Sequence, residues 1–305
     1  MNAKNNSSEN NLPYRVVRVG LTCNINCIFC NIPIESGAHP ARLGFTEIKK
    51  EINEIFSKEK HPKISISGGE PTIHPDIIKI IKYLKKKGAA IIDLQTNAVL
   101  LSNLEFAKKL KKAGLNKIFV SFHSHIPKFH NLLTQSKNGH GRCVQGIKNC
   151  LNSGIEVILN PVINSLTYKF LPDYIEFIHK NFPKIKYISL SIVQPHERAL
   201  KNRKIVPKYE LLSPYIEKAA KLADKFGIVA NNPYCGLPFC FGGWHKRLDK
   251  CLEYSENTIG GGNKSCDKVK LAACEKCDLK NACNGIWRNY LKIHPTLRLK
   301  PIKIN

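Results

Sequence analysis

The sequence predicts an α/β fold, a partial (β/α)6 barrel followed by a small cysteine-rich extension. Apolar strand-like runs alternate with amphipathic helical runs as far as about residue 230, a pattern typical of a parallel sheet with right-handed crossovers. The alternation gives about six βα units. The segment that contains them is shorter than the ~250 residues typical of a full eight-fold barrel. Beyond that point the apolar periodicity ends, and seven of the 12 cysteines fall in the C-terminal part.

The predicted strands are short runs of apolar and β-branched residues, and the predicted helices carry apolar residues at helical spacing. In chain order the strands cover residues 14–22, 63–67, 89–95, 116–122, 155–162 and 187–193. The helices cover residues 46–56, 75–87, 104–113, 142–152, 168–181 and a segment within 207–226. Thr46 is the expected N-cap of the first helix, Gly88 is expected to close the second, and Pro172 fits the first turn of the fifth.

Three segments follow from this pattern. Residues 1–13 predict a loose N-terminal tail, residues 14–230 the barrel, and residues 231–305 the extension. The tail has no apolar stretch typical of an export signal, and the chain has no run of 18 apolar residues that could span a membrane. We therefore expect a cytoplasmic protein with no membrane partner, in which clustered cysteines bind metal rather than form disulfides.

Three cysteines follow the first predicted strand, Cys23, Cys27 and Cys30, at the spacing C-x3-C-x2-C. A 4Fe–4S cluster normally takes four thiolates, one per iron, so three thiolates leave one iron open to bind and activate a small molecule. Zinc is the first alternative, but zinc motifs usually run C-x2-4-C with a distant second pair. The loop leaves the end of a strand, which is where βα proteins place their chemistry.

Two further strand ends carry motifs. Gly68-Gly69-Glu70-Pro71 follows the second predicted strand, and Thr96-Asn97 ends the third. Together with the three cysteines, these motifs resemble the radical SAM enzymes over roughly residues 16–195. The resemblance implies that the cysteines hold a cluster whose open iron binds S-adenosylmethionine. Reductive cleavage of that molecule would release a 5′-deoxyadenosyl radical, which would abstract a hydrogen atom from the substrate.

The resemblance also implies which residues bind S-adenosylmethionine. The glycine pair would let the backbone approach the methionine end, and the Glu70 carboxylate would receive its ammonium group. For each of the more distant polar positions, the alternative to cofactor binding is a structural role in which a polar side chain at a strand end caps a neighbouring backbone. The implied cofactor-binding positions are Phe29, Gly68, Gly69, Glu70, Asn97, Ser121, His123 and Asn160.

The C-terminal run Cys274-x2-Cys277-x5-Cys283 resembles the auxiliary-cluster extension called SPASM or, in its shorter form, Twitch. The resemblance implies one auxiliary 4Fe–4S cluster, held by these three cysteines and Cys240. A zinc ribbon is the alternative for the same spacing. The number of auxiliary clusters stays open, because a second could draw on the remaining C-terminal cysteines, Cys235, Cys251 and Cys266.

We therefore expect a radical SAM oxidoreductase or maturase that modifies a peptide or protein side chain and takes electrons from a flavodoxin or ferredoxin type donor. The alternatives are a small-molecule dehydrogenase or cyclase and, from another class, a non-catalytic iron–sulfur electron-transfer protein. The formal net charge of +25 could attract an acidic or phosphorylated substrate. Only nine of the 48 basic residues are arginine and no RNA-binding signature occurs, so we expect no nucleic-acid partner.

Overall fold

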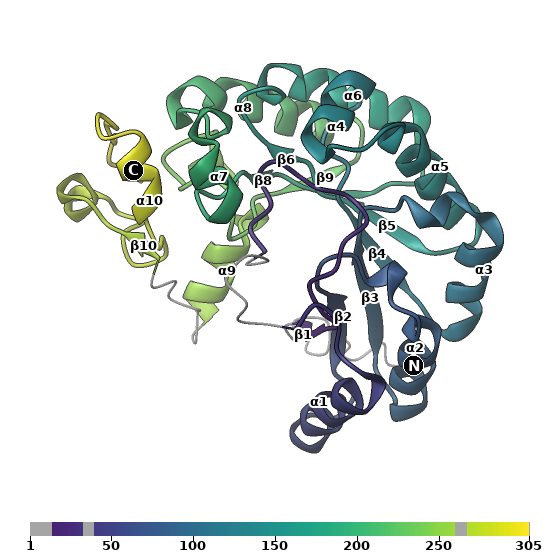
Figure 1. Ribbon diagram of the computed structural model, residues 1–305. Coiled ribbons are helices and arrows are strands. Elements are labelled where there is room, and N and C mark those ends of the chain that lie inside the picture. The colour runs from purple at the N-terminus through teal and green to yellow at the C-terminus, as the bar shows by residue number, and fades with distance from the viewer. Residues whose placement is uncertain (1–13, 33–39, 260–266, 305) are drawn as a thin grey trace, which may run out of the picture. The chain divides into compact units, whose positions relative to one another are not determined.

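The computed structural model describes residues 14–32, 40–259 and 267–304 and contains a parallel sheet of seven strands (Figure 1). The hydrogen-bonded order is β1-β2-β3-β4-β5-β7-β9. These strands are β1 (Tyr14–Arg18), β2 (Lys63–Ser67), β3 (Ile91–Thr96), β4 (Lys117–Val120), β5 (Glu156–Leu159), β7 (Tyr187–Ser189) and β9 (Val229–Asn231). The predicted α/β fold with a parallel sheet is confirmed.

Two smaller sheets and ten α-helices complete the described chain. β6 (Val162–Ile163) pairs parallel with β8 (Ser191–Ile192), and β10 (Lys268–Val269) pairs antiparallel with β11 (Ile286–Trp287). The helices are α1 (Phe45–Lys58), α2 (Ile77–Lys87), α3 (Leu104–Ala113), α4 (Pro127–Thr134), α5 (Gly139–Asn152), α6 (Leu171–Asn181), α7 (Glu197–Lys201), α8 (Tyr209–Lys225), α9 (Leu252–Ile259) and α10 (Arg288–Ile293). None of the helices in these ranges has both the length and the apolar character that a membrane crossing requires.

Contacts divide the chain into two compact units, which are described separately. The first unit comprises Met1–Asn24, Ile32–Val120 and Gly141–Val157, and the second comprises Ile25–Asn31, Ser121–His140 and Ile158–Asn305. The first unit therefore holds β1 to β4, and the second holds β7 and β9. The expected N-terminal tail, residues 1–13, lies outside the described residues.

The two faces of the sheet in the first unit differ in chemistry. Ile64 and Ile66 of β2 are fully buried, and α1, α2 and α3 lie along the strands in Figure 1. The residues that alternate with these isoleucines along β2 are polar, namely Lys63, Ser65 and Ser67. Gln95 accepts a 2.9 Å hydrogen bond from the Ser67 hydroxyl and donates a 3.1 Å bond to the Ser65 hydroxyl. The first unit thus combines one apolar face with one hydrogen-bonded polar face.

The element boundaries follow local capping rules, with one correction. Gly88 ends α2 in the left-handed conformation at φ 87°, as expected for a C-terminal glycine. The N-cap of α1 is Gly44 and not Thr46, because the helix already begins at Phe45. The Gly44 backbone N–H donates to Glu47 Oε2 at 2.7 Å, so a side chain of the first turn satisfies the cap.

The second unit contains elements that the hydrophobic pattern did not reveal. α4 and the edge strand β9 were not predicted, and the predicted strand 155–162 is divided into β5 and the start of β6. α6 begins at Leu171 after a 3-10 turn, and Pro172 lies in its first turn as expected. Cys143 and Cys150, in the first unit, are both fully buried in the apolar core.

Candidate active site

The turn Gly68-Gly69-Glu70 follows β2 and packs closely on the chain that leads to Cys23. A Cβ atom at Gly69 would lie 2.2 Å from the carbonyl oxygen of Thr22, and one at Gly68 would lie 2.2 Å from that of Gly20. The Gly69 and Glu70 amides donate 2.9 Å bonds to the same two carbonyls. Any larger residue at either position would overlap the neighbouring backbone, so both glycines are required whether or not a ligand also approaches this turn.

Glu70 is 2% exposed, and its carboxylate accepts four hydrogen bonds from groups within the protein. Oε1 accepts from the Thr72 amide at 3.0 Å, the Thr72 hydroxyl at 2.6 Å and the Thr96 hydroxyl at 2.7 Å. Oε2 accepts from the Asn97 amide at 2.6 Å. Burial raises the pKa of Glu70, and these four hydrogen bonds oppose that rise. The carboxylate thus joins the turn to the end of β3.

Asn97 contacts the first cysteine of the motif. Its amide nitrogen donates a 2.7 Å bond to Asn24 Oδ1 and lies 3.9 Å from Cys23 Sγ, while its own oxygen accepts from the Val99 amide at 3.0 Å. Asn97 is 6% exposed, so this side chain is fixed on both sides. Within the first unit, β2 and β3 therefore converge on Cys23 through the Glu70 network.

Arg198 of α7 holds the other two cysteines, within the second unit. Its guanidinium donates to the carbonyl of Cys27 at 3.2 Å and also to Asn26 Oδ1, and its amide donates to the carbonyl of Cys30 at 3.3 Å. Both cysteines are partly exposed. The hydrophobic pattern did not identify Arg198, because α7 has only five residues and the contact joins positions 171 residues apart.

Other backbone contacts in the second unit support the same segment. The amides of Asn26 and Ile28 donate 3.0 Å bonds to carbonyls at the end of α4, those of Thr134 and Leu133. Asn31 donates a 2.5 Å bond to Gln194, which follows β8. A segment without regular secondary structure is thereby held in one conformation, with Cys27 and Cys30 at its centre.

His123 lies behind Phe29, the aromatic residue before the third cysteine. The two rings form an edge contact with centroids 5.0 Å apart, and both residues are buried. Burial lowers the pKa of His123 to about 4, so the imidazole is neutral at pH 7. His123 Nδ1 accepts a 3.3 Å bond from the Val162 amide. The neutral ring thus fixes the start of β6.

The remaining implied cofactor positions lie at nearby strand ends of the second unit. Ser121 directly follows β4 and is partly exposed. Asn160 follows β5, and its Oδ1 accepts a 2.5 Å bond from the Ser191 hydroxyl, which in turn accepts from Cys235 at 3.1 Å. Asn160 therefore bonds to the side chain of Ser191 at the start of β8.

Three more histidines lie near His123 in sequence. His130 is 2% exposed and stacks on His123 with centroids 5.9 Å apart. His140 packs against His130 and forms a 3.0 Å hydrogen bond with the backbone oxygen of His125. Burial lowers the pKa of all three. His130 and His140 thus extend an aromatic layer that begins at His123.

Four C-terminal cysteines line one pocket of the second unit. Cys240 comes from the turn after β9, Cys274 and Cys277 from the short helix Ala272–Lys276 and its C-cap, and Cys283 from the following turn. Apolar residues, among them Phe239 and Ile286, line the rest of the wall. Burial raises the pKa of Cys240 to about 12, and the other three thiols also interact with it electrostatically. The structure thus brings together the four residues of the expected auxiliary set.

The remaining C-terminal cysteines lie elsewhere. Cys251 is 1% exposed and packs in the core, where its sulfur lies 3.7 Å from the amide nitrogen of Asn232. Cys235 contacts Ser191, and Cys266 lies outside the described residues. Among the residues that the structure describes, no group of three or more His, Cys, Asp or Glu could hold a single metal ion. The sulfurs around a cluster bind different irons and stand farther apart than ligands of one ion, so this finding concerns single-ion sites.

Comparison with known proteins identifies a family and several relatives. Residues 17–178 match the model of the radical SAM superfamily. A probable GTP 3′,8-cyclase of Saccharolobus islandicus is 30% identical over 271 residues, which cover 81% of this chain and 85% of the relative. A probable GTP 3′,8-cyclase of Methanococcus maripaludis is 32% identical over 208 residues, which cover 62% and 67% of the two chains.

The fold also matches solved structures. The structure of native anSMEcpe with bound AdoMet aligns with a TM-score of 0.62 and 14% identity, and the alignment covers 94% of this chain and 93% of that one. At this identity the likeness concerns the fold alone. It supports the radical SAM partial barrel as the architecture of the chain.

Proposed function

We propose that this chain, which belongs to the radical SAM superfamily, is an enzyme that binds a 4Fe–4S cluster through Cys23, Cys27 and Cys30 and uses it to activate S-adenosylmethionine. When bound, the cluster supplies the electron that cleaves the sulfonium, giving methionine and a 5′-deoxyadenosyl radical that abstracts hydrogen from the substrate. The donor set supports this proposal, because three closely spaced cysteines supply the thiolate ligands that such a cluster requires. A flavodoxin or ferredoxin type protein would deliver the electron.

We assign the chain's own residues two tasks at this site. Arg198 holds the backbone of Cys27 and Cys30, and the Glu70 network holds Cys23 through Asn97. Because four internal donors fill the Glu70 carboxylate, we assign recognition of the methionine ammonium to backbone groups of Gly68 and Gly69. Recognition of the ribose and adenine by Phe29, Ser121, His123 and Asn160 stays a prediction.

For the substrate we propose a small molecule, a purine nucleoside triphosphate such as GTP. The observation that carries this choice is the 30% identity to a probable GTP 3′,8-cyclase over 81% of this chain. The formal charge of +25 suits a polyanionic substrate. Cyclisation would begin with removal of a hydrogen atom from an unactivated ribose carbon, a step for which the adenosyl radical is sufficiently reactive.

Modification of a peptide side chain is the competing reading. It rests on the likeness of the C-terminal cysteine pattern to SPASM or Twitch extensions. The match to the radical SAM superfamily covers residues 17–178 and does not include that pattern. The relatives named as GTP 3′,8-cyclases favour the small-molecule alternative. The two readings predict different substrates for the same radical, and one experiment can separate them.

We further propose that residues 231–305 form a module with one auxiliary 4Fe–4S cluster on Cys240, Cys274, Cys277 and Cys283. The shared pocket supports this assignment, since its wall presents four thiols among apolar side chains. Such clusters are held by four thiolates. An auxiliary cluster in this module could contact the substrate or exchange an electron with it.

The test uses the anaerobically reconstituted full chain with S-adenosylmethionine and dithionite. We expect 5′-deoxyadenosine to form, and to form faster with GTP present than with a mixture of short cysteine-containing peptides. Mass spectrometry of the GTP reaction should show a product of unchanged mass and altered retention, because the hydrogen atom lost to 5′-deoxyadenosine is replaced by one electron from dithionite and one proton from water. Stimulation by the peptides and not by GTP would overturn the substrate assignment.

Two variants control this experiment. Cys27→Ala removes one ligand of the open cluster and should abolish formation of 5′-deoxyadenosine. Cys150→Ala removes a buried thiol of the core and should leave product formation intact. If Cys27→Ala retains full activity, the proposed cluster loop is not the site of the chemistry.

A further inference from the structure

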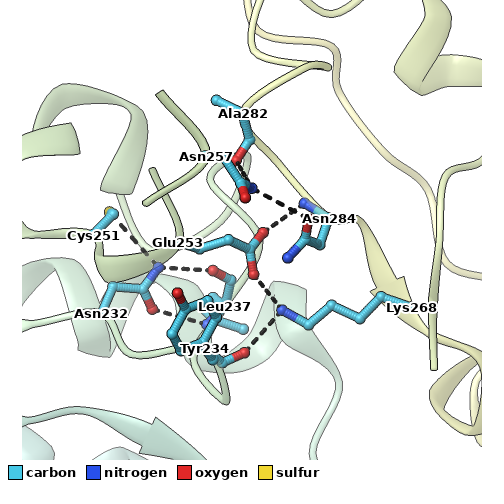
Figure 2. Close-up of polar contacts among 9 residues, drawn as sticks. All are labelled: Asn232, Tyr234, Leu237, Cys251, Glu253, Asn257, Lys268, Ala282 and Asn284. Carbon is cyan, nitrogen blue, oxygen red and sulfur yellow. Dashed lines mark hydrogen bonds and ion pairs between the residues drawn. The ribbon is translucent and has the colours of Figure 1, made fainter. Parts of the chain in front are cut away.

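Figure 2 shows a buried ion pair of the C-terminal module whose carboxylate bonds Asn284, the residue after Cys283. Glu253 of α9 and Lys268 of β10 approach to 2.5 Å between Oε2 and Nζ, and each side chain is only 6% exposed. Removing two charges from water costs several kcal/mol per ion, which their attraction offsets only with good geometry and further hydrogen bonds. A buried pair is therefore weak evidence for stability alone, and its other contacts indicate its role.

Two side chains of α9 hold the neighbours of Cys283 on both sides. Glu253 Oε1 accepts a 2.6 Å bond from the Asn284 amide, which directly follows Cys283. The amide nitrogen of Asn257, one helical turn later, donates to the carbonyl of Ala282 at 2.8 Å and to Asn284 Oδ1 at 3.2 Å. These bonds appear together in Figure 2. The backbone of Cys283 is thus fixed by one face of a helix.

The other partner of the ion pair reaches the segment that leads to Cys240. Lys268 Nζ donates a 2.8 Å bond to the carbonyl of Tyr234 and lies 5.0 Å from the centroid of the Trp287 ring. Within this segment, Asn232 bonds both backbone groups of Leu237, its amide at 3.0 Å and its carbonyl at 2.9 Å. Lys268 thus connects the residues beside Cys283 to Tyr234, six residues before Cys240.

Both charges of the pair lie next to Cys283. The Glu253 carboxylate bonds the amide of Asn284, the residue directly after Cys283, and Lys268 balances its charge in the ion pair. A cluster bound at that sulfur would sense the same two charges, because electrostatic interactions are strong in a low-dielectric interior.

We propose that Glu253 and Lys268 are positioning residues of the auxiliary cluster, which hold Cys283 in place and keep the charge beside the cluster neutral. This inference rests on the proposed auxiliary cluster. The pair has two consequences that can be separated. Loss of its hydrogen bonds loosens Cys283, and loss of one charge leaves the other uncompensated beside the cluster. The second consequence has a sign that depends on which partner is changed.

The test measures the midpoint potential of the auxiliary cluster in the full-length chain with Cys23, Cys27 and Cys30 all replaced by Ala. Only the auxiliary cluster remains in this background, and each reduction adds one electron to it. Glu253→Gln keeps a side-chain oxygen for the Asn284 amide but leaves Lys268 uncompensated, so the potential should rise. Lys268→Met leaves Glu253 uncompensated, so the potential should fall. Glu217→Gln, which breaks a surface pair with Lys221, should leave the potential unchanged.

Shifts of the midpoint potential in opposite directions in Glu253→Gln and Lys268→Met support the proposal. If both variants keep their full iron content and their potentials shift equally or not at all, the proposal is overturned. A merely structural pair would lower iron retention in both variants without opposite shifts in potential. The double variant with Glu253→Gln and Lys268→Met carries no buried charge at this pair and should return the potential toward the starting value. If one single variant does not fold, the other must still shift the potential in its predicted direction relative to Glu217→Gln. If the triple-alanine background itself binds no iron, the proposed auxiliary cluster fails, and that result is distinct from failure of the positioning role.

Asn257→Ala tests the positioning of Cys283 independently, because the substitution changes no charge. The substitution removes the bonds to Ala282 and Asn284 and leaves the ion pair intact. We expect partial loss of cluster iron or an altered electron paramagnetic resonance line shape of the reduced cluster, with little change in potential. Full iron retention with an unchanged spectrum would contradict the positioning of Cys283 by α9.

Discussion

Glu70 and Asn97 are joined by a 2.6 Å hydrogen bond from the Asn97 amide to Glu70 Oε2, which links the turn after β2 to the end of β3. The same asparagine reaches Cys23 through its side chain. A buried carboxylate with four donors thus connects a glycine turn, a strand end and a cysteine in the first unit. Loss of its second acceptor oxygen should weaken all three.

Glu70→Gln should destabilise the chain and weaken binding of S-adenosylmethionine. The glutamine NH2 group cannot accept a hydrogen bond, so at least one buried donor loses its partner, which costs about 1–3 kcal/mol. Thermal unfolding of the apo chain should show a melting temperature lower by several degrees, and equilibrium dialysis should show weaker cofactor binding. Glu54→Gln, at an exposed position of α1, is the control and should change neither quantity.

Gly69→Ala should disrupt the turn more severely than its small added volume suggests. The new Cβ would meet the Thr22 carbonyl oxygen at 2.2 Å, and this contact is backbone that cannot move without displacing the segment before Cys23. We expect loss of S-adenosylmethionine binding in equilibrium dialysis. Gly44→Ala is a matched control, because its Cβ would meet only the end of the Glu47 side chain, at 3.3 Å. Similar binding by both variants would contradict the packing argument.

Arg198→Ala should reduce retention of the front cluster. The guanidinium bonds to the Cys27 carbonyl and to Asn26 would be lost, so two of the three expected ligands would lie on a looser segment. Iron analysis after desalting should show a loss of up to about four atoms per chain, the content of one cluster. Arg203→Ala, at an exposed position five residues later, should retain the wild-type iron content.

Cys240 and Cys251 offer a matched pair for the auxiliary cluster. Burial raises the pKa of each thiol to about 12, but only Cys240 lines the four-cysteine pocket. Cys240→Ser should lower the iron content by up to about four atoms per chain, whereas Cys251→Ser should not. Equal iron contents in the two variants would refute the proposed ligand set. One tightly bound zinc per chain would point to the zinc ribbon instead.

His123 should make the stability of the apo chain fall with acid. Its pKa is lowered from 6.5 to about 4 by burial, so below pH 6.5 the unfolded chain takes up a proton that the folded chain excludes. Stability is therefore full above pH 6.5 and is lost progressively down to pH 4, by about 3 kcal/mol in total for this group. Urea unfolding at several pH values measures this loss.

His123→Asn isolates that contribution. Asparagine offers an oxygen to the Val162 amide and does not titrate in this range, so the variant should lose less stability between pH 6.5 and 4 than the wild type. His130 remains in both proteins, and burial is the main cause that lowers its pKa. Parallel curves for the two proteins would show that His123 is not buried and neutral.

Local patterns predicted much of the fold. The run 63–67 forms β2 with the predicted bounds, and α3 covers the predicted residues 104–113, because alternation of apolar and polar residues at period 2 or at helical spacing distinguishes strands from helices. Short elements escaped the same reasoning. β9 has three residues and lies at the edge of the sheet, and α7 has five, which is too short for a period to be recognised.

The types and local spacing of the side chains specify the chemistry that the site can offer. Three clustered cysteines, a Gly-Gly-Glu turn and four C-terminal cysteines predict thiolate ligands and a close backbone approach without knowledge of the fold. Which groups hold these ligands depends on contacts between distant parts of the chain. Arg198 meets Cys27 across 171 residues, and Glu253 meets Asn284 across 31. Such partners are chosen by packing and burial in three dimensions, which no local pattern records.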